Sequence, residues 1–301
     1  MKGATEKYYL QLLTAPFGKK EIPENDFFLY RELADQNILI SNCETNYSSI
    51  ISNIIELEKC IAINILEQRY TLKRKSITLE MQNIYPKISN LLCSCRQYLD
   101  QNSNYLEKIS GAIYKEFTSS KSSFYDTVIE YKFFDKFRNH NQHKGLGING
   151  ISFEFSSQKI NDEPILDYRY SALINISSLR KDKKFPQTLI SEAMQSKMFN
   201  TQGVCTNIHQ PILIYVACIS KIHAKIRTTL KNTLKNNQER MNDIVRSHIN
   251  IDDSARFYLS QETSENEIFG LGPASEFVDD VLEAMQEFNA PIRSEAFRIN
   301  F

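Results

Sequence analysis

Residues 211–235 read PILIYVACISKIHAKIRTTLKNTLK and carry the clearest periodicity in the chain. Their apolar residues return every three or four positions, which is the repeat of one face of an α-helix. The recurring residues are Ile212, Tyr215 or Val216, Ile219, Ile222, Ile226, Leu230 and Leu234. The pattern predicts a helix over residues 207–248, roughly 60 Å long at about 1.5 Å per residue.

The same periodicity recurs upstream and predicts four further helices. We expect them over residues 50–65, 76–98, 105–117 and 123–143, with Asn42 and Asn46 as caps before the first. Pro86 lies inside the second of these helices and is expected to kink it. The fourth carries an apolar face made of Phe124, Val128, Tyr131, Phe134 and Phe137.

Other segments read as strands or short helices. Residues 151–155 alternate polar and apolar side chains, and residues 165–174 are rich in aromatic and β-branched residues, so the two are expected to form a hairpin or small sheet between helices. We also expect a strand at residues 37–40, in an otherwise irregular N-terminal region. The remaining predicted elements are a short helix at 189–198, a strand at 256–259 and an amphipathic helix at 274–288.

Together these patterns predict a mainly α protein, a helical bundle with a small antiparallel β insertion and an α/β C-terminal tail. We divide the chain into an irregular or strand-containing segment (1–43), a helical domain (44–248) with the β insertion at about 148–177, and an acidic C-terminal segment (249–301). The length of 301 residues is enough for a full core, and 9 Gly and 8 Pro are too few for an all-β protein with many tight turns.

The net charge of zero hides an uneven distribution. Residues 250–301 contain eleven acidic and three basic residues, a balance of −8, so the rest of the chain carries +8. A basic body suits a polyanionic partner such as RNA, although the two parts could simply be differently solvated surfaces. The acidic tail is either a competitor for the RNA-binding surface or a structural element packed on the bundle through its apolar face.

The sequence points to a cytoplasmic protein. The longest nearly uninterrupted apolar stretch, residues 211–219, is far shorter than the roughly 20 residues of a membrane span, so no membrane partner is expected. The first twenty residues lack the apolar core of a signal peptide. The six cysteines are scattered, which is typical of thiols in a reducing compartment.

One polar run directly follows the apolar face of the fourth predicted helix. It reads Arg138-Asn139-His140-Asn141-Gln142-His143-Lys144. RNA can be cleaved by attack of its own 2′-OH on the adjacent phosphate, which needs a proton acceptor, a proton donor and positive charge on the phosphate. Histidine suits acid–base work near neutral pH, and arginine binds phosphate oxygens with a charged fork. The run therefore carries the groups that metal-independent RNA cleavage requires.

This run resembles the signature of the HEPN superfamily, an Arg often followed by Asn, then a His after four to six intervening residues. Arg138, Asn139 and His143 match it with four intervening residues. By this resemblance, His143 would be the acid–base catalyst, Arg138 the transition-state stabiliser and Asn139 an orienting or RNA-contacting residue. The resemblance implies a HEPN-like fold and a metal-independent endoribonuclease, without metal or other cofactor, of the kind found among toxins and effectors of antiviral or abortive-infection systems.

Residues five apart on an ideal helix point about 140° away from each other. Arg138 and His143 would therefore converge only if the helix unwinds near Asn141, or if a second subunit completes the site. HEPN ribonucleases resemble the second case, so we expect a homodimer or higher homo-oligomer, restrained by an antitoxin or regulatory partner. The alternative is a non-catalytic HEPN-like module that dimerises and binds a partner or nucleotide.

Several other basic residues are auxiliary candidates for substrate binding. His140 and Lys144 lie in the same run, and Arg227, Lys231 and Lys235 step by four along the long helix, as a solvated face or as one bank of an RNA cleft. His140 and His143 could also bind a metal with Asp135, but a third ligand on the same helix face is not evident, so we expect no metal site.

Overall fold

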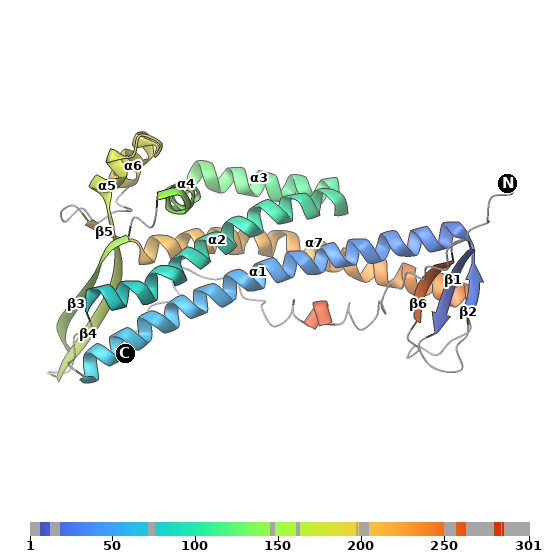
Figure 1. The fold of residues 1–301 in the computed structure, drawn as a ribbon, viewed down its shortest axis with the longest axis horizontal. Helices are drawn as coiled ribbons and strands as arrows, with labels where there is room; N and C mark the ends of the chain where they lie inside the picture. The colour runs from blue at the N-terminus through green and yellow to red at the C-terminus, as the bar shows by residue number, and fades with distance from the viewer. Residues whose placement is uncertain are drawn as a thin grey trace. The chain divides into compact units, whose positions relative to one another are not determined.

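The computed structural model describes residues 7–12, 19–71, 76–144, 148–160, 163–196, 198, 205–249, 257–262, 280–283 and 285. The described chain is mainly helical, as the sequence predicts, and contains two small three-stranded antiparallel sheets, of which the sequence predicts only the β insertion (Figure 1). It forms two compact units. Unit 1 contains the described parts of Met1–Glu44, Asn104–Ile113 and Lys225–Asn289, and unit 2 contains those of Thr45–Ser103 and Tyr114–Ala224.

The elements follow one another along the chain with short connections. In order they are β1 (Lys7–Leu12), β2 (Lys19–Ile22), α1 (Glu24–Thr71), α2 (Ile77–Ile109), α3 (Gly111–Thr127), α4 (Ile129–Lys144), β3 (Ile148–Ile160), β4 (Glu163–Asn175), α5 (Ile176–Lys181), α6 (Gln187–Gln195), β5 (Cys205–Asn207), α7 (His209–His248) and β6 (Phe257–Glu262). Helices α1, α2, α3 and α7 contribute residues to both units.

Unit 1 is built around the sheet β2-β1-β6. Its central strand pairs antiparallel with both neighbours, with Leu10 opposite Leu259 on one side and Tyr8 opposite Ile22 on the other. These apolar residues are buried together with residues from the first turns of α1 and the last turns of α7, namely Phe27, Tyr30, Leu33, Met241, Ile244 and Val245. The sheet therefore packs on the two helices through a single apolar core.

Helices α1 and α7 run antiparallel within unit 1 and are also joined there by polar contacts. Asn237 donates to Asn37 at 3.0 Å, and the buried Arg227 guanidinium contacts the Glu44 carboxylate at 2.7 Å. Buried charges and amides of this kind are stable only when they are paired. These pairs fix the register of the two helices inside unit 1.

The core of unit 2 is aromatic. It contains the fully buried rings of Tyr98, Phe117, Tyr131, Phe133, Phe134, Phe137 and Tyr215, from α2, α3, α4 and α7. Within this unit α1 and α7 again run antiparallel, because Tyr47 hydrogen-bonds Ser220 at 2.7 Å and Glu58 contacts His209 at 2.7 Å. The ring of His223 stacks on Tyr47 with centroids 3.9 Å apart and hydrogen-bonds the hydroxyl of Tyr98.

The second sheet, β3-β4-β5, belongs to unit 2 and confirms the predicted β insertion. Strands β3 and β4 form a long antiparallel hairpin, with Phe153 opposite Tyr170. Tyr170, Ala172 and Ile174 alternate along β4 and are buried, so this face of the sheet packs inward. The hairpin follows α4 directly, after residues 145–147, which lie outside the described chain.

The N-terminal region differs most from expectation. Residues 37–40 are helical rather than a strand, and Asn42 and Asn46 lie inside α1 rather than at its start. The helix begins after Pro23, with Glu24 and Asp26 in its first turn, where acidic residues are favoured by the helix dipole. Buried residues then continue at helical spacing as Phe27, Tyr30, Leu33, Asn37 and Ile40. Two strands precede the helix, so the segment 1–43 is not mainly irregular.

The other helix boundaries shift more modestly. Ser76 caps α2 by accepting from the backbone N–H of Leu79 at 3.2 Å, but α2 continues past residue 98 to Ile109 with Pro86 inside it. The break that we expected before residue 105 instead falls at Ser110, and a second break falls at Val128, within the predicted fourth helix. The long helix is confirmed as α7, and the short helices α5 and α6 both lie between β4 and β5.

Only part of the acidic C-terminal segment is described. Strand β6 confirms the predicted strand, and its Leu259 is buried against β1. Residues 280–283 and 285 are helical, with Val281 and Met285 buried, while most of the predicted helix 274–288 lies outside the described residues. No helix in the described parts of the chain has the length and apolar content needed to cross a membrane.

Candidate functional site

The polar run identified in the sequence occupies the last two turns of α4, in unit 2. The helix reaches it through Tyr131, Phe134 and Phe137, which are buried and hold α4 in the core. Asn139 is exposed, Arg138 and Asn141 are half-buried, and His140 is mostly buried. The backbone stays helical through Lys144. The side chains of Gln142, His143 and Lys144 lie outside the described residues.

Helical geometry sorts these positions around the axis. At about 100° per residue, Arg138 and His143 lie on different sides of α4, whereas Asn139 and residue 143 are one turn apart on the same side. Because α4 does not unwind near Asn141, one of the two ways of bringing Arg138 and His143 together is absent in this chain.

The guanidinium of Arg138 is held by its neighbour. Its Nη1 donates to Oδ1 of Asn139 at 3.1 Å, so the amide holds the guanidinium toward the exposed side of the helix. Its Nε is buried and has no hydrogen-bond partner among the described residues. No described carboxylate pairs with Arg138 either, which leaves a cation with unused donors beside the polar run.

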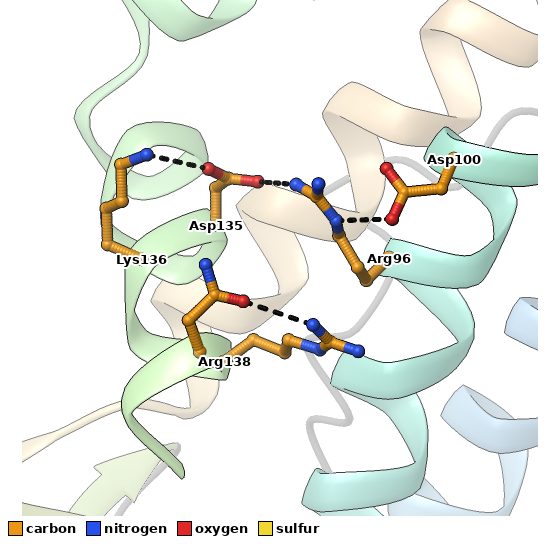
Figure 2. Close-up of polar contacts among 6 residues, drawn as sticks. Arg96, Asp100, Asp135, Lys136 and Arg138 are labelled. Carbon is orange, nitrogen blue, oxygen red and sulfur yellow. Dashed lines mark hydrogen bonds and ion pairs between the residues drawn. The ribbon is translucent and has the colours of Figure 1, made fainter. Parts of the chain in front are cut away.

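A second arginine nearby shows the opposite arrangement. Figure 2 shows Arg96 of α2 between two carboxylates, Asp100 at 2.7 Å and Asp135 at 2.9 Å. Lys136 also contacts Asp135, at 3.5 Å. The charge of Arg96 is therefore neutralised within the protein, and Asp135 is engaged away from His140. An arginine that binds an anionic ligand needs free donors, and of these two Arg138 has them.

His140 is engaged on the other flank of the run. Its Nδ1 contacts Oδ2 of Asp182 at 2.6 Å, and both side chains are mostly buried, at 10% and 7% exposure. Asp182 caps the C-terminus of α5, and its other carboxylate oxygen accepts from the backbone N–H of Lys184 at 3.0 Å. Nδ1 of His140 is therefore engaged within the protein, and the auxiliary phosphate-binding role expected for His140 stays a prediction that would have to use Nε2.

The basic stripe on α7 needs correction at Arg227, whereas Lys231 and Lys235 stay predictions. Arg227 is 9% exposed and paired with Glu44, so its guanidinium points into unit 1 rather than toward a ligand. Lys231 is half-buried and Lys235 is exposed, and both belong to unit 1, whereas the polar run belongs to unit 2. The spacing of four puts the three residues on adjacent turns of one helix face, but Arg227 is buried whereas the two lysines are at least partly exposed.

We expect Arg227→Met to lower the free energy of unfolding by about 3–5 kcal/mol, because it leaves Glu44 buried without its partner. Urea unfolding followed by circular dichroism measures this loss. The matched control Lys231→Met, on the same helix one turn away, should change it by no more than about 0.5 kcal/mol. The double substitution Glu44→Leu with Arg227→Met replaces both partners and should recover most of the lost stability. If Arg227→Met and Lys231→Met instead change the free energy of unfolding equally, the ion pair is not buried in solution.

Buried groups elsewhere in unit 2 are kept neutral. Burial raises the pKa of the Tyr131 hydroxyl far above its usual range, helped by the nearby Asp135 carboxylate, and burial raises the pKa of Cys218 to about 11. Neither group offers a proton donor or nucleophile at neutral pH. Tyr131 and Cys218 are therefore not candidates for the acid–base chemistry of the polar run.

No known protein family, curated protein or solved structure matches this chain. The site is thus interpreted from its own chemistry. It consists of an unneutralised arginine, an exposed amide that orients it, and two histidine positions at the end of one helix. Asp182 is the residue that the sequence did not reveal, because it lies 42 positions from His140 in a charged loop without a spacing signal.

Proposed function

We propose that this protein is a metal-independent endoribonuclease of the HEPN type. The main support for this proposal is the environment of Arg138. Its guanidinium is oriented by Asn139 and lacks a carboxylate partner in the described chain. A phosphate that gains negative charge during cleavage is the ligand that such a fork binds best. His143 would exchange the protons, as the sequence motif implies.

The reaction needs no further group. A base takes the proton of the 2′-OH, the 2′-oxygen attacks the phosphate, and the bond from phosphorus to the 5′-oxygen breaks as that oxygen gains a proton. The products are a 2′,3′-cyclic phosphate and a 5′-hydroxyl. Arg138 would stabilise the charge on the phosphate oxygens, and Asn139 would hold Arg138 and contact RNA.

Purified protein tests this function directly. Incubated with single-stranded RNA in EDTA, the wild-type chain should generate fragments with 2′,3′-cyclic phosphate and 5′-hydroxyl ends, detectable by mass spectrometry. Absence of cleavage, or cleavage that appears only with added divalent metal, would contradict the proposal. Binding of a partner or nucleotide without cleavage would favour the non-catalytic module.

Assembly into a homodimer is part of the proposal. Since α4 is continuous, Arg138 and His143 of one copy lie on different sides of the helix, and a second copy would supply the missing group. The apolar face of α4 does not serve this purpose, because Phe134 and Phe137 are buried within their own unit. The interface must therefore lie on the exposed side, around Asn139.

We accordingly expect the active protein to have about twice the 34.9 kDa mass of one chain. Sedimentation velocity at micromolar concentration measures this mass. An Asn139→Arg substitution places like charges across the expected interface, so it should shift the protein toward monomer and reduce cleavage together. Full activity at monomer mass would refute the composite site.

A further inference from the structure

We infer that His140, held by Asp182, is a second acid–base group of the site and donates the proton to the leaving 5′-oxygen. This rests on the proposed ribonuclease function and assigns within it a residue that lies outside the Arg–His motif. The observation behind it is a mostly buried pair between His140, on the turn of α4 that carries the motif, and Asp182, at the C-terminus of α5.

The contacts around Asp182 define its role. Oδ2 contacts Nδ1 of His140 at 2.6 Å, Oδ1 accepts from Lys184 N–H at 3.0 Å, and the backbone carbonyl accepts from Nε2 of Gln187 at 3.2 Å. A carboxylate held at both oxygens cannot rotate away. It accepts a hydrogen bond from Nδ1–H of His140, fixes the ring orientation and stabilises the imidazolium cation, as the aspartate of a catalytic triad does.

The rest of the His140 ring is set by aromatic neighbours. Phe137 stacks on it, with planes 22° apart, and Phe185 meets it edge-on at 84°. Asp182 is the charged group among its described contacts. With Nδ1 committed to Asp182, the proton available for transfer is on Nε2, for which no described residue provides a hydrogen-bond partner.

The position of His140 along α4 places it next to the motif residue 143. Residues 140 and 143 are three apart and therefore neighbours on one side of the helix, with the exposed Asn139 beside them. Arg138 lies on the other flank. One copy of the helix end thus presents two imidazole positions, which is what cleavage with one base and one acid requires.

The proton balance is then complete. His143 removes the proton from the 2′-OH as the 2′-oxygen bonds to phosphorus. The bond from phosphorus to the 5′-oxygen breaks, and the 5′-oxygen takes the Nε2 proton of His140. The imidazolium becomes a neutral ring whose Nδ1–H remains bound to Asp182.

The experiment compares two substrates that differ in the leaving group. A dinucleotide releases a 5′-alkoxide that needs a proton, whereas uridine 3′-(p-nitrophenyl phosphate) releases a stable anion that does not. We expect His140→Gln to slow cleavage of the dinucleotide by at least about 100-fold, the typical contribution of a general acid, and to slow the activated substrate by less than about 10-fold. The variant should also lose the alkaline fall in the pH profile of kcat/KM, which reports deprotonation of the acid.

The Asp182→Asn variant tests whether Asp182 orients the His140 ring and stabilises its charge, or only packs against it. The amide oxygen can still accept from Lys184 N–H, but the amide group offers no negative charge and favours the wrong histidine tautomer. We expect the same substrate-dependent loss as for His140→Gln. The matched control is His209→Gln, which breaks a similar pair with Glu58 outside α4 and should leave both rates unchanged.

The outcomes are distinct. If His140→Gln slows both substrates equally and keeps the alkaline limb, or slows neither, His140 is a structural clamp and the inference is wrong while the ribonuclease proposal stands. If wild-type protein cleaves neither substrate, the proposed function fails and the inference fails with it.

Discussion

His143→Ala and Arg138→Ala are each expected to reduce RNA cleavage in EDTA by at least about 100-fold, the usual effect of removing an acid–base group or a charge-stabilising donor. Loss of His143 removes the base, and loss of Arg138 removes the cation that stabilises the phosphate. The measurement is the initial rate of cleavage of a fluorescent RNA oligonucleotide.

Two control variants make this result specific. Arg138→Lys keeps the charge but not the planar fork, so it should retain only part of the activity. Lys221→Ala removes an exposed cation on α7 and should have little effect. Cleavage that persists in His143→Ala would contradict the assignment of the motif, provided that circular dichroism shows the His143→Ala and Arg138→Ala proteins to be folded.

Removal of residues 250–301 is expected to unfold unit 1 or make the chain insoluble. The deletion takes away β6, which pairs with the whole of β1, and the buried residues Leu259, Val281 and Met285. It exposes the apolar face of the sheet and one of its edges. These contacts support the structural reading of the acidic tail over its role as a competitor for RNA.

A point substitution keeps this prediction measurable if the deletion yields no soluble protein. Leu259→Ala should lower the free energy of unfolding by about 2–5 kcal/mol, the usual cost of a cavity in a core, while Glu283→Ala at an exposed position should change it by no more than about 0.5 kcal/mol. A shortened chain that stays folded and cuts RNA faster, with the gain shrinking as salt rises, would instead support restraint by the tail.

Elements with long and regular periodicity could be predicted from the sequence. Helix α7 and the β3–β4 hairpin follow from apolar repeats of helical and strand type. The start of α1 was missed, although Pro23 and the acidic first turn signal it, because residues 37–40 look like a strand in isolation. Asn37 and Ile40 are buried while Ile38 between them is exposed, which is helical spacing, and Asn37 contacts Asn237 of α7, a contact that a local pattern does not contain.

The candidate site likewise has features that are local in the sequence, which can be predicted, and features that depend on distant residues, which cannot. The order Arg138-Asn139 and the turn carrying residue 143 are local, so the sequence indicates them. Partners that come from other elements are not visible in it. Arg227 is paired with Glu44 and so is not available in the predicted basic stripe, and Asp182 fixes the orientation of His140. In both pairs the partner is distant in the sequence. Charge spacing alone cannot tell an exposed cation from a paired one.

The most direct test of a composite ribonuclease site is complementation between two inactive chains. Arg138→Ala and His143→Ala proteins are mixed, allowed to exchange subunits, and assayed for RNA cleavage in EDTA, with native mass spectrometry to count mixed dimers. If each site takes Arg138 from one copy and His143 from the other, random exchange makes half the dimers mixed, each with one of two sites intact, so activity should return to about a quarter of wild type. Mixed dimers that form but cleave no faster than either parent variant would contradict the account.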